Sequence, residues 1–260
     1  MKPRLAAFGN ALLDYFHFSE IPPNLAGDFA PGAIHHPSHE KIDELLLSLG
    51  DYIAVAGGGA TNCARIFRAL GGDASFCGCV GTDEEGVFYR RELEETGITT
   101  ELLERDGRTG RFVVLISRDE RLVLVNSGVA SELDPDIGLV EKLTAGIEIV
   151  HLDGFIATHP ANLENLVDKL LKLGKHISFD AGGRKLCLQN RGLFKTIMSV
   201  SDYIFVNRDE YEALFEDPVE ASLARVSAEL PGLLIVKRDA AGAVCWHRGQ
   251  FVESPVRTVK

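Results

Sequence analysis

The feature that most constrains this fold is a strand–helix rhythm in the second half of the chain. Four apolar, strand-like runs begin at residues 149, 177, 203 and 233, so their starts are 28, 26 and 30 residues apart. This interval is long enough for a helix to carry the chain back to the start of the next parallel strand. Amphipathic helical patterns fill the intervals, as at Leu163, Leu166 and Leu170. The rhythm predicts an α/β fold: a doubly wound, mostly parallel sheet with helices on both faces.

The remaining apolar runs extend this prediction to both ends of the chain. Residues 5–8 and 75–80 read as further core strands, and residues 61–70 and 84–96 as helices that stop at glycines. Residues 243–252 have the pattern of a hairpin with a short turn.

Two segments, at about 15–56 and 98–126, do not fit the rhythm. The second contains two alternating runs at 111–117 and 121–125, which predict a β-hairpin. We therefore expect one α/β domain over residues 1–260, with a small β-rich lid inserted at these two places. A lid matters where water must be kept from a reactive centre.

Composition removes several classes of function. The 260 residues carry 27 basic and 38 acidic side chains, a net charge of −11, which argues against broad binding to nucleic-acid phosphates. No apolar stretch approaches the roughly 20 residues of a membrane helix, and the start of the chain lacks a signal-peptide pattern, so a cytoplasmic location is expected.

Cysteine and histidine give little sign of a metal site. The five cysteines have no paired C-x-x-C spacing, which favours reduced, mostly buried thiols. His35, His36 and His39 gather in one stretch. Either they bind a metal or they belong to a solvated loop before a helix capped by Ser38, and the loop is the favoured interpretation.

The densest glycine cluster, Gly57–Gly58–Gly59, leads directly into the helix expected at 61–70. Glycines there allow backbone N–H groups to approach a ligand, but a tight turn with positive φ requires them equally well. The chain has neither G-x-x-x-x-G-K-[ST] nor a G-x-G-x-x-G after its first strand. P-loop and dinucleotide-dehydrogenase functions are therefore disfavoured.

Polar side chains recur where strands end. In doubly wound sheets such positions share the crevice in which ligands bind, although each residue alone is as readily a helix cap. Asn207 and Glu210 are spaced either to act together on a cation and its waters or to form a capping box. The recurring residues are Asp14, Asp83, Asp153, Asp180 and Asn207.

Six short segments together resemble the ribokinase-like, PfkB-type carbohydrate kinases in order and spacing. The resemblance covers essentially the whole chain. Within the family, the long first insertion, with a helix near 39–49 before the Gly-Gly-Gly motif, is most similar to the adenosine-kinase-like branch. The segments are G-N-A-L-L-D at 9–14, G-G-G-A-T-N at 57–62, V-G-T-D-E-E-G at 80–86, D-A-G-G-R at 180–184, N-R-D-E at 207–210 and V-K-R-D-A-A-G-A at 236–243.

The resemblance implies that a primary hydroxyl of a sugar or nucleoside attacks the γ-phosphate of ATP with the help of Mg²⁺. By position, Asp14 would accept hydrogen bonds from substrate hydroxyls, and Gly58, Gly59 and Asn62 would line the sugar pocket. Ribokinases proper often carry Lys where this chain has Gly59, which puts ribose in doubt as the substrate.

The same resemblance assigns the phosphate donor to the second half of the chain. Asn207 and Glu210 match a motif that organises Mg²⁺ and phosphate, with Glu210 acting on the metal through water. Lys237 and Gly242 would contact the nucleotide. A homodimer through the lid is a further implication, with the strand at 111–117 as the contact.

One family motif is missing from the 260 residues. No D-x-x-G-A-G-D, which would supply an anion hole and the general base, occurs in the sequence, and the base is expected beyond Lys260. Without it we expect no competent kinase, since one oxyanion donor alone is worth about 2.7–4 kcal/mol. A chain cut short, a split gene and a degenerate member remain open. The alternative function is a non-catalytic sugar- or nucleoside-binding or dimerising protein.

Overall fold

The computed structural model describes residues 2–18, 29–30, 32–117 and 120–256. The chain divides into two compact units, unit 1 with Met1–Phe8 and Asp134–Lys260, and unit 2 with Gly9–Leu133. The tip of the predicted hairpin at 118–119, part of the first predicted insertion and the last four residues lie outside the described residues.

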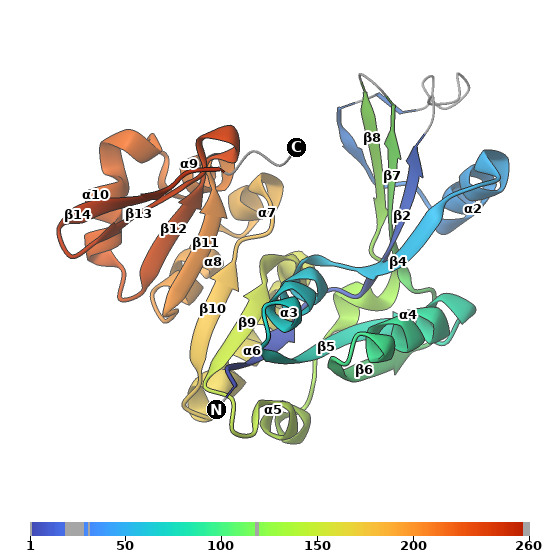
Figure 1. Ribbon diagram of the computed structural model, residues 1–260, viewed down its shortest axis with the longest axis horizontal. Coiled ribbons are helices and arrows are strands. Elements are labelled where there is room, and N and C mark those ends of the chain that lie inside the picture. Colours follow the sequence, from blue (N-terminus) through green and yellow to red (C-terminus); the bar gives the residue numbers. More distant parts are fainter. Residues whose placement is uncertain (1, 19–28, 31, 118–119, 257–260) are drawn as a thin grey trace. The chain divides into compact units, whose positions relative to one another are not determined.

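Unit 1 is built on a mostly parallel sheet in the order β14-β13-β12-β11-β10-β9-β1 (Figure 1). All five predicted core strands of this unit and the hairpin are present, and only β13 runs in the opposite direction, so that it pairs antiparallel with both β12 and β14. The strands are β1 Arg4–Phe8, β9 Ile149–Asp153, β10 His176–Asp180, β11 Tyr203–Asn207, β12 Leu233–Lys237, β13 Ala243–His247 and β14 Gln250–Ser254.

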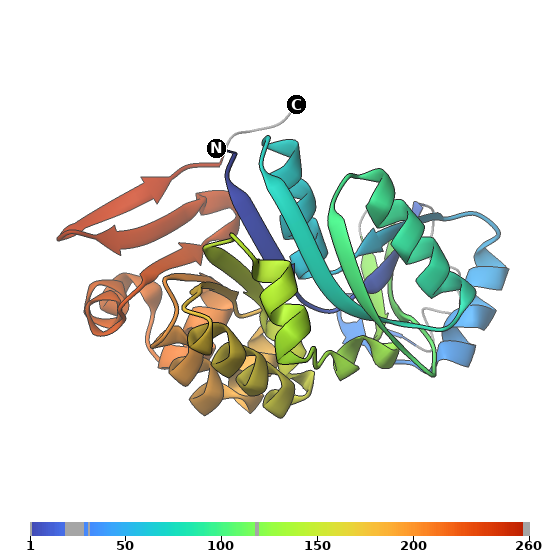
Figure 2. The same ribbon diagram turned by 90° about the horizontal axis from the view of Figure 1, so that it is seen from below.

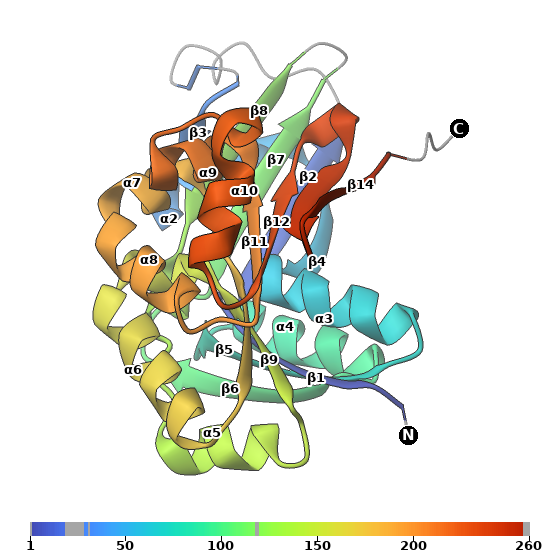
Figure 3. The same ribbon diagram turned by 90° about the vertical axis from the view of Figure 1, so that its left-hand side faces the viewer.

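Helices of unit 1 fill the intervals between these strands, and α6 to α9 form one layer beside the sheet (Figures 2 and 3). The stripe of Leu163, Leu166 and Leu170 is fully buried, as the 3.6-residue spacing predicts. The helices are α5 Ile137–Thr144, α6 Pro160–Lys172, α7 Arg184–Gln189, α8 Arg191–Met198, α9 Arg208–Phe215 and α10 Val219–Glu229, with short 3₁₀ turns η2 Gly154–Thr158 and η3 Asp239–Ala241.

Unit 2 contains a parallel strand pair and a separate sheet. β5 Asp73–Gly81 pairs with β6 Thr99–Arg105, and the unit's helices include α3 Gly59–Ala69 and α4 Glu84–Glu95. β6 lies inside the segment 98–126 that was expected to belong to the lid, yet it pairs with the core strand β5 and not with the lobe strands. Its sequence T-T-E-L-L-E-R has no continuous apolar run, because most of its residues are only half-buried.

The second sheet of unit 2, here called the lobe sheet, has the order β3-β8-β7-β2-β4. β7 and β8 form the predicted antiparallel hairpin, and β2 begins at Leu12, before the expected insertion (Figure 1). The elements are β2 Leu12–Phe18, β3 Ile34–His35, α2 His39–Leu49, β4 Ile53–Gly57, β7 Gly110–Ile116 and β8 Arg121–Asn126, followed by the 3₁₀ turn η1 Gly128–Glu132.

A buried arginine fastens helices to one face of the lobe sheet. Arg111 on β7 is 4% exposed and binds Asp43 of α2 at 2.6 Å and Glu85 of α4 at 2.8–2.9 Å. Arg108 adds a two-pronged pair to Asp43, and Ser38 caps α2 as predicted. A buried guanidinium is tolerated because these carboxylates satisfy it.

Candidate functional site

The first group of candidate residues surrounds Asp14 in unit 2. The sequence suggested that Asp14 comes directly after a strand. In the structure it lies inside β2, on the opposite face from Tyr15. Its side chain is 9% exposed, and within the described part of the chain its carboxylate accepts no hydrogen bond. Its oxygens are not among the buried polar atoms that lack a partner, so they keep some access to solvent and can accept hydrogen bonds from water or from a ligand.

The glycine cluster is required by close approach to this carboxylate. A Cβ on Gly57 would lie 2.1 Å from the Asp14 carboxyl carbon. Gly58 has a φ of +98°, and a Cβ there would lie 2.1 Å from the carbonyl oxygen of Asn10. The tight-turn requirement is therefore met at Gly58, and Gly57 makes room for Asp14. Gly59 and Asn62 lie in the first turn of α3, with Asn62 exposed.

Two charged residues that the sequence analysis did not single out complete this group. Arg65 of α3 forms an ion pair with Glu92 of α4 through Nη2 and Oε1. The other Glu92 oxygen accepts a hydrogen bond from the backbone N–H of Ala56. Their signal in the sequence was weak, because each looks like an ordinary polar residue on a helix surface.

The protonation of Asp14 follows from these surroundings. Burial raises the pKa of Asp14 from an ordinary 3.8 to about 7; the nearby Arg65 guanidinium opposes this rise and Glu92 adds to it. Asp14 therefore titrates near neutral pH, where a change in one neighbouring charge alters its ionised fraction.

The second group lies at the carboxyl ends of adjacent parallel strands in unit 1. Asn207 caps α9, and its Oδ1 accepts a hydrogen bond from the Glu210 N–H at 2.9 Å. In return, Glu210 accepts bonds from the N–H and Nδ2 of Asn207, both at 2.7 Å. This capping box is one of the two predicted alternatives for the pair, and burial raises the pKa of Glu210.

Lys237 and Asp180 stand beside this box. Lys237 Nζ donates to Asp180 Oδ2 at 2.7 Å, and the Gly182 N–H donates to Asp180 Oδ1 at 3.0 Å. Gly242 has a φ of +79°, and a Cβ there would lie 2.0 Å from the carbonyl oxygen of Ser254. The four residues predicted to contact the phosphate donor thus occur in one unit, and Asn207 is the register partner of Lys237.

The other polar strand ends act as caps. Asp83 accepts from the Gly86 N–H at 2.9 Å, and Asp153 accepts from the Phe155 N–H at 3.0 Å. Each therefore does what the simpler of its two interpretations predicted.

Metal chemistry is limited by the donor set. Among the described residues, no group of three or more His, Cys, Asp or Glu side chains could hold an ion, and His35, His36 and His39 form no such group. Both Glu210 oxygens already accept hydrogen bonds. The pair Asn207 and Glu210 fits Mg²⁺ reached through water, since Mg²⁺ commonly keeps several waters and binds substrate phosphates.

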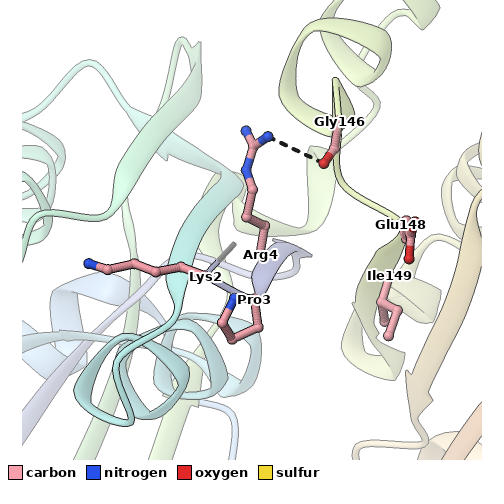
Figure 4. Close-up of a pocket in the computed structure, with 6 residues that line it drawn as sticks. All are labelled: Lys2, Pro3, Arg4, Gly146, Glu148 and Ile149. Carbon is pink, nitrogen blue, oxygen red and sulfur yellow. Dashed lines mark hydrogen bonds between the residues drawn. The ribbon is translucent and has the colours of Figure 1, made fainter.

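A pocket of about 430 Å³ lies elsewhere, at the amino ends of β1 and β9 (Figure 4). Arg4 Nη1 donates to the Gly146 carbonyl at 3.3 Å across it. Because it opens at the opposite strand ends from Asp180 and Asn207, it does not belong to the second group.

Over the described ranges, no helix has the length and apolarity needed to cross a membrane.

Comparisons with known proteins identify the family and the fold of the chain. Residues 39–260 match the model described as the pfkB family carbohydrate kinase. The chain is 32% identical over 167 residues to the ATP-dependent ribose-1-phosphate kinase of Halopiger xanaduensis, an alignment covering 63% of this chain and 54% of that relative. It is 26% identical over 221 residues to the fructokinase of Klebsiella pneumoniae, covering 81% and 72%.

Solved structures show the same fold. Adenosine kinase from Schistosoma mansoni in complex with adenosine superimposes with a TM-score of 0.86 at 19% identity, over 100% of this chain and 83% of that one. Adenosine kinase from Sinorhizobium meliloti gives 0.84 at 19% identity, over 100% and 82%. The chain thus spans about half the length of the ribose-1-phosphate kinase it matches, and over four fifths of these structures.

Proposed function

The chain belongs to the PfkB family of carbohydrate kinases, and from this premise we propose that it serves the ATP-dependent phosphorylation of a primary hydroxyl of a sugar or nucleoside. Its relatives include a ribose-1-phosphate kinase and a fructokinase.

The observation that carries the proposal is the carboxylate of Asp14. It is buried and receives no hydrogen bond from the described residues. Acceptor hydroxyls would supply the missing donors, while Gly58, Gly59 and Asn62 line the same turn. Such a site binds through the hydroxyl groups, and so distinguishes a polyol from an apolar molecule of similar size.

The phosphate donor is assigned to unit 1. Asn207 and Glu210 orient water toward the phosphates, Lys237 contributes a positive charge, and the backbone at Gly242 follows the nucleotide. When bound, Mg²⁺ would neutralise charge on the phosphates. Phosphoryl transfer depends mostly on positioning and charge stabilisation, which is what residues of these types provide.

Binding is the first property to measure, because the general base placed beyond Lys260 stays a prediction. Calorimetry with a panel of nucleosides and sugars is expected to give binding by the wild-type chain and a loss of at least about tenfold in Asp14→Asn, since each hydrogen bond to a charged group contributes about 1.5–3 kcal/mol. The exposed Asp106→Asn, with the same charge change, is the control.

Unchanged affinity in Asp14→Asn contradicts the proposed acceptor site. A turnover assay with Mg·ATP then separates a kinase from the alternative, a non-catalytic binding protein, which binds without turnover. The cytoplasmic location and the homodimer through the lid remain predictions, and a sedimentation measurement of mass tests the second.

A further inference from the structure

Two helices of unit 2 hold the end of β4 with a matched set of side chains. Thr61 and Arg65 are one turn apart on α3, and Tyr89 and Glu92 are one turn apart on α4. The Tyr89 hydroxyl lies 2.5 Å from Thr61 Oγ1 and donates to the Gly57 carbonyl at 3.0 Å. The Arg65–Glu92 ion pair lies beside this contact, with Glu92 also binding the Ala56 N–H.

This set determines what Asp14 rests against. In the antiparallel register of β2 and β4, Ala56 lies opposite Leu13, and the next residue, Gly57, lies directly under the Asp14 carboxyl group. The two helices therefore fix the peptide that Asp14 contacts. Ala56, Thr61 and Tyr89 are completely buried, so this peptide has little freedom to move.

We propose that the Arg65–Glu92 pair is a positioning device for the acceptor site: it holds the β4 end against Asp14 and sets the pH range over which the acceptor binds. The inference rests on the proposed role of Asp14 as the residue that binds the acceptor hydroxyls. Neither Arg65 nor Glu92 is assigned a contact with the acceptor itself.

The charged groups around Asp14 indicate that Arg65 and Glu92 control its protonation. Arg65 of α3 and Glu92 of α4 act electrostatically on Asp14, and Tyr89 of α4 stays neutral because burial raises the pKa of its hydroxyl. On the strands beside it, Val55 of β4 and Phe112 of β7 occupy the paired positions and carry no charge.

The only other charged side chain close along β7 is turned away. Arg111 is the register partner of Leu13, and its guanidinium binds Glu85 and Asp43 on the other face of the lobe sheet. One cation and one anion therefore oppose each other at Asp14. Removing the cation disfavours the Asp14 carboxylate, and removing the anion favours it.

The test is to titrate Asp14 by NMR with ¹³C-carboxyl-labelled aspartate in the whole protein. We expect Glu92→Gln to lower the Asp14 midpoint and Arg65→Gln to raise it, each by about one pH unit, because Glu92 raises and Arg65 lowers the pKa of Asp14. Glu104→Gln, which removes the similar Arg90–Glu104 pair at 2.8 Å, is the control and leaves the midpoint in place.

Acceptor affinity, measured by calorimetry from pH 5 to 9, is expected to follow the same order. Its midpoint moves to lower pH in Glu92→Gln and to higher pH in Arg65→Gln. A purely structural role would weaken binding in both variants without moving the midpoints in opposite directions. If Arg65→Gln does not fold, Arg65→Lys keeps the charge and is expected to retain the wild-type midpoint.

Different results would overturn the role of the Arg65–Glu92 pair and the proposed function. Midpoints that do not move, or that move in the same direction, overturn the role of the pair even if acceptors bind. Opposite movements of the Asp14 midpoint in a protein that binds no nucleoside or sugar overturn the proposed function and the acceptor part of this inference, and leave only the electrostatic coupling.

Discussion

The candidate-site carboxylates of the two units differ in the hydrogen bonds they accept. In unit 1, Asp180 accepts from Lys237 and the Gly182 N–H, and both oxygens of Glu210 accept from Asn207. In unit 2, Asp14 is buried and accepts nothing from the described residues. The first arrangement is satisfied within the protein, whereas the second leaves the carboxylate free to accept hydrogen bonds from water or from the proposed ligand. The difference predicts that Asp14 lowers the stability of the folded chain near neutral pH.

The largest expected effect is a gain of stability on neutralising Asp14. Burial raises the pKa of Asp14 from 3.8 to about 7, so between these values the unfolded chain is ionised while the folded chain holds a proton. The stability from this proton is complete below about pH 4 and is lost as the pH rises to 7. Asn cannot ionise and does not lose this stability. The unfolding free energy of Asp14→Asn relative to wild type should therefore be about 2–3 kcal/mol higher at pH 8 than at pH 5.

Denaturant unfolding at the two pH values measures this gain, with Asp106→Asn as the matched exposed control. An equal free energy difference between Asp14→Asn and wild type at both pH values would show that Asp14 is not held in a costly state. The claim that the Asp14 carboxylate of unit 2 destabilises the folded chain would then be wrong.

A smaller effect, of the opposite sign, is expected in unit 1. Asn207→Ala removes a helix cap and leaves a buried Glu210 oxygen without a donor, which should cost about 1–2 kcal/mol. The surface cap Asp136→Ala on α5 is the control and should cost less, because no buried carboxylate depends on it. Equal losses from the two variants in urea unfolding would indicate that Glu210 gains nothing from Asn207 beyond ordinary capping.

The smallest effect is expected at Lys237. Its pair with Asp180 is partly open to solvent, with 46% and 29% of the two side chains exposed, so Lys237→Met should change the unfolding free energy by less than about 1 kcal/mol. Binding of ATP should weaken clearly in the same variant, because Lys237 is assigned to the nucleotide. A large loss of stability with unchanged ATP affinity would reverse this assignment.

Much of the fold follows directly from the sequence. The four strands expected to start at 149, 177, 203 and 233 are present, with starts within one residue of these positions, because buried parallel strands carry continuous apolar runs. The hairpin expected at 243–252 is also present and extends to Ser254. β6 was assigned to the wrong sheet, since an edge strand with mixed polarity gives no such run. Tertiary pairing, and not local pattern, decides its place.

The candidate site was predictable only in part. Motifs singled out Asp14 and Asn207, whose binding roles stay predictions. N-x-x-E is the signature of a capping box as well as of a metal-organising pair, so the sequence left both open, and the structure contains the capping box. Arg65 and Glu92 were missed because they are 27 residues apart on different helices and meet only through packing. No local spacing reports such a contact.

The unpaired carboxylate of Asp14 also bears on how such a chain would drift over generations. A protein relieved of any need to bind a polyol would become more stable by exchanging this one aspartate for its amide, a change that adds no bulk beside Gly57. Selection for stability alone therefore works against Asp14, and only a ligand that returns the lost free energy works for it.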